Sequence, residues 1–181
     1  MNRLFARGGG VIAAGWRVRH MAATADLCDK FGDSVKVVDA ALAFRSFGQR
    51  KAFGGPIATV KCFEDNSVVK AAVTSPGDGK VLVVDGGGSS RRALLGDDLA
   101  MNASKNGWAG IVINGYLRDS DIIQGIDIGV KALGTVPRKT EKRNIGERDV
   151  TVEFGGARFI PGHFVYCDPD GIVVSDKQLS L

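Results

Sequence analysis

The sequence is poor in the side chains that bind zinc or form disulfides. Its histidines and cysteines are His20, His163, Cys28, Cys62 and Cys167. None of them has a partner at the spacing of zinc ligands, and no Cys-x-x-Cys pair is present, so the sequence predicts no zinc site. An odd and scattered set of cysteines favours reduced thiols in an intracellular compartment, and we expect the cytoplasm. His163 follows a Pro-Gly pair, where we expect a surface turn.

Long hydrophobic runs are also missing. No uninterrupted apolar stretch approaches the roughly 18 residues that a membrane-spanning helix needs, so we expect no membrane partner. No Pro- or Ser-rich linker and no internal repeat divides the 181 residues, and residues 24–181 are therefore expected to form a single domain. With 44% hydrophobic residues, a chain of this length can bury one substantial core.

Acidic residues are absent from the first 23 positions, which carry Arg3, Arg7, Arg17 and Arg19. These four arginines equal the whole excess of 24 basic over 20 acidic residues, so the remainder of the chain is neutral. Nucleic-acid binding rests on a concentrated positive field, and we expect no nucleic-acid partner. Residues 1–23 are expected to be an extension outside the domain: a disordered segment, a mitochondrial targeting sequence, or a misassigned start upstream of Met21.

Hydrophobic periodicity predicts a parallel β/α centre. Apolar, β-branched runs predict strands at residues 35–40, 57–63, 81–85, 110–114 and 127–133. Helix-forming stretches predict helices at residues 24–32, 67–73, 91–106 and 120–124, the third of them interrupted at Gly96. Thr24 is expected to cap the first helix, and Asn66 or Asp65 the second. Strands joined by a helix form right-handed parallel units, so the central strands are expected to be parallel.

Turn residues after Val150 predict a different arrangement. Short alternating segments at residues 151–154, 157–160, 163–167 and 171–175 are separated by Gly-Gly, Pro-Gly and Asp-Pro-Asp-Gly turns. That pattern is typical of an antiparallel meander. A parallel centre followed by antiparallel hairpins makes the predicted fold class a mixed α/β fold with more than one sheet layer.

Three consecutive glycines, Gly86 to Gly88, follow the strand predicted at residues 81–85. A glycine loop between a strand and a helix can hold a phosphate or a dinucleotide. Here the third glycine of the Gly-x-Gly-x-x-Gly fingerprint and the Gly-Lys-Ser/Thr of the P-loop are both absent. The better interpretation is a tight turn that lets the backbone pass close to a neighbour.

Gly96, Asp97, Asp98 and Leu99 indicate the start of a helix inside the third predicted helical stretch. A glycine can end one helical piece and begin another, and the exposed N–H groups of the new helix would form a site for a carboxylate. The alternative is that two surface acids simply begin a helix. From these residues alone, the alternative is favoured.

Arg118 and Asp119 follow the buried strand at residues 110–114. Ligands gather at the carboxyl ends of strands in parallel β/α units. An arginine there offers a planar fork for a carboxylate, and an aspartate offers a hard oxygen ligand for Mg²⁺ or Mn²⁺. Local alternatives are equally open: an ion pair between the two side chains, or Asp119 as the cap of the helix at residues 120–124.

Five long segments occur in the same order in a known family: FGGPIATVKCFEDNSVV, GKVLVVDGGGSSRRALLGDDLA, NGWAGIVINGYLRDSD, DIGVKALGTVPRK and GARFIPGHFVYCDPDGIVVS. Through them the chain resembles the family of regulator of ribonuclease activity A, which includes the class II 4-hydroxy-4-methyl-2-oxoglutarate aldolases. The resemblance spans about residues 24–175. It implies a swivelling β/β/α fold with mixed parallel and antiparallel sheets, and a homotrimer with the active site between subunits.

The resemblance also implies an activity and the residues that perform it. Members with an Arg-Asp pair in this loop are aldolases and oxaloacetate decarboxylases that use a divalent cation, Mg²⁺ or Mn²⁺. By resemblance, Arg118 binds the substrate and Asp119 the metal, and the backbone around Gly96, Asp97, Asp98 and Leu99 binds a substrate carboxylate. The implied reactions release pyruvate from 4-hydroxy-4-methyl-2-oxoglutarate and from oxaloacetate.

One departure from the family pattern keeps other functions open. Many active members carry an acidic residue three places after the metal ligand, where this chain has Ile122, with Asp121 one position early. The founding member of the family regulates a ribonuclease and lacks the aspartate of the pair. The alternatives are therefore a non-catalytic regulator that binds and inhibits a ribonuclease, or an oligomer with a vestigial site.

Overall fold

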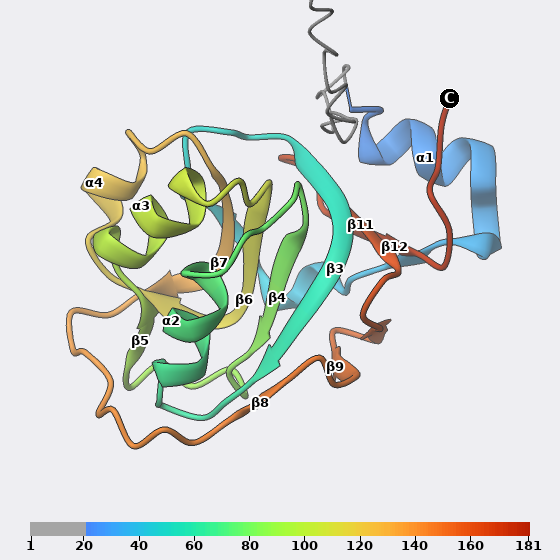
Figure 1. Ribbon diagram of the computed structural model, residues 1–181. Coiled ribbons are helices and arrows are strands. Elements are labelled where there is room, and N and C mark those ends of the chain that lie inside the picture. The colour runs from blue at the N-terminus through green and yellow to red at the C-terminus, as the bar shows by residue number, and fades with distance from the viewer. Residues whose placement is uncertain (1–20) are drawn as a thin grey trace, which may run out of the picture.

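The computed structural model describes residues 21–181 as short helices and strands (Figure 1). The helices are α1 (Thr24–Phe31), α2 (Ser67–Val73), α3 (Asp97–Lys105) and α4 (Ser120–Ile123), with 3₁₀ turns at Gly32–Ser34 and Ala40–Leu42. The strands are β1 (Lys36–Val37), β2 (Arg45–Ser46), β3 (Phe53–Lys61), β4 (Val81–Asp85), β5 (Ala93–Leu95), β6 (Gly110–Leu117), β7 (Gly129–Thr135), β8 (Glu147–Arg148), β9 (Val152–Phe154), β10 (Ala157–Phe159), β11 (Phe164–Cys167) and β12 (Ile172–Ser175). The prediction for residues 1–23 falls almost entirely outside the described residues and stays a prediction.

Four parallel strands form the centre of the sheet. β3, β4, β6 and β7 lie side by side in that order, each parallel to the next. The side chains of residues 81–84 and 111–113 are buried, which explains their continuous apolar runs, because a strand covered on both faces has no polar side. The predicted parallel centre is confirmed. The strands end together at one edge of the sheet, here called the carboxyl edge.

Helices α2, α3 and α4 cover one face of this parallel centre (Figure 1). Buried side chains beneath them form one apolar cluster, which includes Val69, Ala100, Ile113 and Ile123. α2 follows β3 and α3 follows β5, so both helices begin at the carboxyl edge. The first turns of the two helices thereby lie at the same edge of the sheet as the loop that follows β6.

The chain after β8 forms the second layer. β11 pairs antiparallel with both β3 and β12, and β9 and β10 form a separate hairpin. Their apolar side chains, among them Phe159 and Val165, pack with Val81 and Val83 from the other face of the parallel strands. The predicted meander is confirmed as two hairpins. The predicted fold class, mixed α/β with parallel and antiparallel sheets, is confirmed as well.

Helix α1 lies outside both layers, against β11 and β12 (Figure 1). Thr24 is its first residue but not its cap, because Ala23 occupies the N-cap position. The Thr24 amide and hydroxyl instead donate to the Asp168 carboxylate at 2.6 and 2.7 Å. A buried carboxylate is costly without donors, and this requirement outweighs capping. The prediction of a Thr24 cap is wrong.

Strand β5 replaces the first part of a predicted helix. Helix α3 begins only at Asp97 instead of Arg91, because residues 93–95 pair with the end of β6. All three side chains of β5 are buried, and this burial outweighs the helix propensity of alanine and leucine. Gly96 therefore separates a strand from a helix rather than two helical pieces.

Smaller differences concern element ends and exposure. The strand predicted at residues 35–40 is reduced to β1, because Asp39 accepts a hydrogen bond from the Ala41 amide and begins a 3₁₀ turn. The strand predicted from Ile57 begins earlier, at the start of β3. His163 is half-buried rather than fully on the surface. Among residues 21–181, the cysteines are free thiols and no helix has the length and hydropathy of a membrane-spanning segment.

Candidate active site

Strand β6 leads directly into Arg118 and Asp119. The Arg118 amide donates to the Leu95 carbonyl at 2.9 Å, which ties the pair to β5. Asp119 has φ 57° and ψ 36°, a left-handed conformation that costs a non-glycine residue roughly 1 kcal/mol. A positive φ also occurs at Ala43, Glu64, Asp78, Asn144 and Asp149. This conformation therefore sets the direction of the Asp119 side chain without by itself indicating a functional site.

The Asp119 side chain contacts its neighbour and not the helix that follows. Its Oδ2 lies 3.2 Å from Arg118 Nε. Asp119 occupies the N-cap position of α4, but its side chain makes no capping bond. Of the local alternatives, the cap is therefore wrong and the ion pair is present. The two side chains remain 40% and 33% exposed, so the pair is accessible to a ligand.

Gly96 lies directly against this pair. A Cβ at position 96 would lie 2.9 Å from Asp119 Oδ2 and 3.2 Å from Arg118 Nε. The backbone at Gly96 is extended, with φ −131° and ψ −179°, a conformation that any residue adopts. The glycine is therefore required for the space it leaves and not for its backbone freedom.

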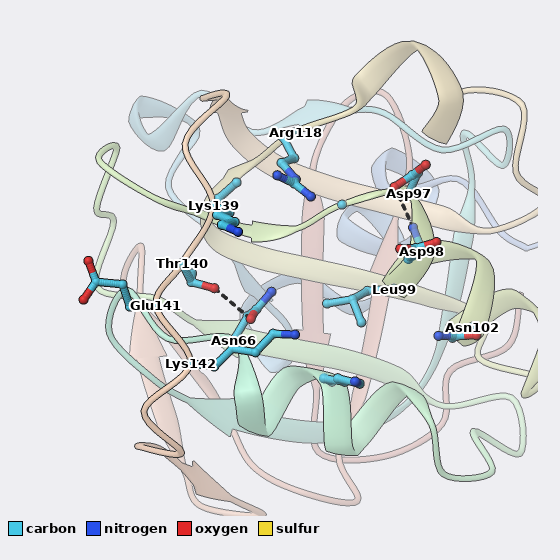
Figure 2. Close-up of a pocket in the computed structure, with 13 residues that line it drawn as sticks. Asn66, Asp97, Asp98, Leu99, Asn102, Arg118, Lys139, Thr140, Glu141 and Lys142 are labelled. Carbon is cyan, nitrogen blue, oxygen red and sulfur yellow. Dashed lines mark hydrogen bonds between the residues drawn. The ribbon is translucent and has the colours of Figure 1, made fainter.

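A cavity of about 710 Å³ opens beside Arg118 at the carboxyl edge (Figure 2). Five of the predicted site residues line it: Gly96, Asp97, Asp98, Leu99 and Arg118. The remaining lining residues are Asn66, Lys70, Ala93, Asn102, Lys139, Thr140, Glu141 and Lys142. Residues that are distant in the sequence thus meet around one hollow.

Asp119 does not line this cavity. It faces a smaller neighbouring hollow of about 240 Å³, which is also lined by Arg118, Thr135, Val136 and Pro137. Arg118 is the residue that the two hollows share. Arg118 therefore lies between a ligand in the cavity and the carboxylate of Asp119.

The first turn of α3 forms one wall of the cavity. The N–H groups in this turn have no partners within the helix, and the positive end of the helix dipole attracts anions. One of them, the Asp98 amide, donates to Asp97 Oδ1 at 2.8 Å (Figure 2). The Asp97 carboxylate therefore already accepts from one of these donors, and the other N–H groups of the turn are left for a ligand.

The opposite wall is an irregular segment, residues 138–146, that we call the strap. Arg92 holds its first half by donating to the Lys139 carbonyl at 2.9 Å and to Glu141 Oε1 at 2.7 Å. Glu141 consequently points away from the cavity, whereas Lys142 extends from the strap toward its interior (Figure 2). The strap thus supplies positive charge to this wall.

Asp65 holds the second half of the strap. Its buried carboxylate accepts hydrogen bonds from the amides of Ser67, Arg143 and Ile145 at 2.8, 2.7 and 3.2 Å. Burial by itself would raise the pKa of Asp65, but hydrogen bonding by the Ser67 side chain and by these three amides outweighs it and lowers the pKa to about 2. Asn66 occupies the N-cap position of α2 without a capping bond, so Asp65 is the one of the two predicted caps that bonds the helix.

Seven charged or polar residues of the cavity were not predicted as site residues: Asn66, Lys70, Asn102, Lys139, Thr140, Glu141 and Lys142. Lys139 and Lys142 follow β7, and the basic run PRKTEK after a third parallel strand was a usable signal, since such loops meet at one edge. Lys70 and Asn102 lie one turn into α2 and α3. Only the packing of those helices brings them to the site, and no local pattern indicates it.

Asp119 fits a divalent cation as a single protein ligand. Within residues 21–181, no three His, Cys, Asp or Glu side chains are arranged as a metal site. Mg²⁺ commonly keeps several waters and takes only one or two protein carboxylates plus oxygens of the substrate. A half-exposed carboxylate with one arginine contact fits that mode of binding, and it does not fit the three or four protein ligands of a zinc site.

The glycine loop after β4 is a tight turn, as predicted. The amides of Gly86 and Gly88 donate to the Asn114 carbonyl at 2.9 and 3.1 Å, and that of Gly87 donates to the carboxylate at the end of β4 at 3.0 Å. A Cβ on Gly86 would overlap the Leu94 side chain. These amides are bonded within the fold and are not directed at a phosphate.

Comparison with known proteins identifies relatives over most of the chain. The RraA-like family model, described as Aldolase/RraA, matches residues 24–174. A protein of Hahella chejuensis named "Putative 4-hydroxy-4-methyl-2-oxoglutarate aldolase" is 56% identical over 158 residues, which cover 87% of this chain and 95% of the relative. A protein of the same name from Pseudomonas aeruginosa (strain LESB58) is 57% identical over 158 residues, 87% of this chain and 96% of the relative.

Two solved structures share the fold. The protein of Geobacillus kaustophilus described as "S-adenosylmethionine: 2-dimethylmenaquinone methyltransferase" has a TM-score of 0.83 and 52% identity, and the match covers 87% of this chain and 97% of that one. The RNA-processing inhibitor RraA from Thermus thermophilis has a TM-score of 0.84 and 39% identity, with 88% and 96% covered. Sequence and fold agree over nearly the full length of these relatives, and the chain belongs to the RraA-like family.

Proposed function

We propose that the protein is a lyase that releases pyruvate from short 2-oxo acids with the help of a divalent cation, Mg²⁺ or Mn²⁺. The reactions are the retro-aldol cleavage of 4-hydroxy-4-methyl-2-oxoglutarate and the decarboxylation of oxaloacetate. The observation that carries the proposal is the accessible Arg118–Asp119 pair in a left-handed loop beside a lysine-lined cavity. The relatives named as aldolases support the first reaction.

Both substrates are dicarboxylates, and two walls of the cavity suit their two ends. The first turn of α3, with Arg118 beside it, suits the carboxylate of the 2-oxo acid end, because amides and a guanidinium fork both bind carboxylates. The strap, with Lys139 and Lys142, suits the second carboxylate. When each carboxylate of the substrate is paired with the positive charge of its wall, the carbon–carbon bond to be cleaved lies between the two walls.

Asp119 would hold the cation as its single protein carboxylate. When bound, the cation supplies a Lewis acid that stabilises negative charge on a substrate oxygen. Cleavage of the carbon–carbon bond leaves an electron pair next to the 2-oxo group, and its charge spreads onto the oxo oxygen. In the retro-aldol reaction the C4 hydroxyl gives its proton to a base and becomes the carbonyl of a second pyruvate, whereas in the decarboxylation the second carboxylate leaves as CO₂. A proton from water then converts the remaining fragment to pyruvate. Arg118 is permanently protonated and lies beside Asp119, where its positive charge stabilises the same developing charge.

The proposal is tested by measuring pyruvate release from both substrates before and after chelation with EDTA. Chelation should abolish turnover, and Mg²⁺ or Mn²⁺ should restore it. Asp119→Asn should lose metal affinity and nearly all activity while remaining folded, because the side chain is partly exposed. Asp121→Asn removes the same charge from an exposed position two residues further on and should stay active. Turnover that survives thorough chelation would overturn the metal mechanism.

A non-catalytic regulator of a ribonuclease is the second candidate function. The similarity to the RNA-processing inhibitor from Thermus thermophilis favours it. Ile122 is 56% exposed beside the site, where an acid is expected of an active member. If the protein inhibits a ribonuclease and releases no pyruvate with added Mg²⁺ or Mn²⁺, the regulator is the correct function and the lyase proposal is wrong. The homotrimer and the cytoplasmic location stay predictions.

A further inference from the structure

Asp65 is a buried carboxylate that the proposed reaction does not use. It does not line the cavity, and its oxygens accept hydrogen bonds from the amides of Ser67, Arg143 and Ile145. Burying a carboxylate is costly unless donors surround it. Two of these three donors belong to the strap, so the strap is the segment that the carboxylate restrains.

Lys142 lies between two fixed points of the strap. The residue before it, Glu141, is bonded to Arg92, and the amide of the residue after it, Arg143, donates to Asp65. A lysine ammonium sits on a flexible four-carbon stem, so its position is set first by where its backbone is held. Here the backbone is held at the Lys139 carbonyl on one side and at the Arg143 amide on the other, and the side chain extends into the cavity (Figure 2).

We propose that Asp65 is a positioning residue that directs Lys142 toward the second carboxylate of the substrate by restraining the strap. The identity of the substrate rests on the proposed function, whereas the restraint on the strap does not. Asparagine replaces Asp65 poorly in this role, because it lacks the negative charge that strengthens all three hydrogen bonds. Oδ2 accepts from both strap amides and Oδ1 from the Ser67 amide, so the asparagine NH2 group would face an N–H donor whichever way it is turned.

The restraint is tested by amide hydrogen exchange. Asp65→Asn should accelerate exchange at Arg143 and Ile145 and leave the protection of the parallel strands unchanged. Asp168→Asn is the matched control, because Asp168 is also buried and also accepts hydrogen bonds from backbone amides, at the start of α1 and in the turn before β12. The control should leave exchange in the strap unchanged. Unaltered exchange at Arg143 and Ile145 in Asp65→Asn would overturn the inference.

The positioning role is tested by steady-state kinetics with 4-hydroxy-4-methyl-2-oxoglutarate. Asp65→Asn should raise KM about tenfold and lower kcat less than about threefold, because the affected contact is with the end of the substrate that is remote from the cation. The inhibition constant of pyruvate, which has only one carboxylate, should not change. Asp168→Asn should keep the parent KM. An unchanged KM in Asp65→Asn overturns the inference.

A double-mutant cycle separates positioning from a general loss of structure. Lys142→Met should raise KM by itself, and Asp65→Asn combined with Lys142→Met should be no worse than Lys142→Met alone. Residues that act through one another are non-additive, whereas independent effects multiply. If the effects of the two single substitutions on KM multiply in the double variant, the inference is overturned. If Asp65→Asn does not fold, Asp65→Glu, which keeps the charge but displaces both oxygens by one methylene, takes its place in the exchange measurement and in the same cycle.

Failure of the function and failure of the inference give different results. If the parent protein releases no pyruvate with added Mg²⁺ or Mn²⁺, the proposed function fails, and the role for Lys142 fails with it. The exchange data still decide whether Asp65 restrains the strap. If the parent is active but KM in Asp65→Asn equals that of the parent, the inference fails and the proposed function stands.

Discussion

Replacing Gly96 by alanine perturbs the site at one defined point. The new Cβ would lie 2.9 Å from Asp119 Oδ2 and 3.2 Å from Arg118 Nε. Both distances are shorter than ordinary contacts, so the ends of these two side chains must move by a few tenths of an ångström. The extended backbone of residue 96 accepts alanine without strain, and the substitution therefore acts on the pair alone.

Stability and activity should respond differently to Gly96→Ala. Alanine reduces the conformational entropy of the unfolded chain, which stabilises the fold by about 0.4–1 kcal/mol. That gain offsets the small displacement of two half-exposed side chains, so we expect the free energy of unfolding to stay within about 1 kcal/mol of the parent. Misplacing catalytic groups by less than 1 Å is far more costly, and kcat/KM should fall about tenfold to a hundredfold.

Gly125→Ala provides the matched control for this prediction. A Cβ at position 125 would meet only the Ile122 carbonyl, at the ordinary distance of 3.5 Å. Both variants would be compared with the parent by denaturant unfolding and by pyruvate release. Gly125→Ala should leave kcat/KM unchanged. A fully active Gly96→Ala protein would refute the reasoning, since it would show that the closeness of Gly96 to the pair does not matter for catalysis.

Two further predictions concern Arg118 and Asp65. Arg118→Lys keeps the positive charge but loses the planar guanidinium, so its Mg²⁺ affinity, measured by calorimetric titration, should match that of the parent. Its kcat/KM should fall about tenfold to a hundredfold, which is equivalent to losing a charged hydrogen bond of roughly 1.5–3 kcal/mol. An unchanged kcat/KM would contradict a bidentate contact. The pKa of Asp65 in the folded protein, about 2, lies below the ordinary value of 3.8. The ionised carboxylate therefore stabilises the folded state by about 2 kcal/mol. This contribution is complete above about pH 4 and is lost as the pH falls toward 2. The unfolding free energies of the parent and Asp65→Asn should therefore differ near neutral pH and converge near pH 2, and a pH-independent difference would exclude this linkage.

Strands β4 and β6 were predictable because burial on both faces leaves a continuous apolar run. Their parallel pairing made the loop after β6 a sound place to expect Arg118 and Asp119 to act. Strand β5 was not predictable, since Ala-Leu-Leu is a helix-forming sequence and only its pairing with β6 makes it a strand. Local patterns report what a residue prefers, and pairing over a distance overrides that preference where burial is complete.

The fold brings the predicted site residues together, but it divides them unexpectedly between two hollows. Gly96 to Leu99 and Arg118 line one cavity, as a shared carboxylate-binding role requires, but Asp119 faces a separate hollow. The direction of a side chain after a strand depends on the backbone conformation at that residue. The left-handed backbone of Asp119 sets that direction, and nothing in the sequence around Arg-Asp-Ser indicates it.

The division of the site explains how one fold can serve both an enzyme and a regulator. The cavity is built from β5, the first turn of α3, α2, the strap and Arg118. The hydrogen bonds that hold β5, α2 and the strap together do not involve Asp119. Asp119 contributes one ion pair to the fold, with Arg118. A relative without this aspartate would keep the sheet and the cavity and lose only the hollow suited to a cation. Under the proposed function, catalysis and fold are separable at a single residue, which is consistent with relatives named as aldolases and as an RNA-processing inhibitor within one family.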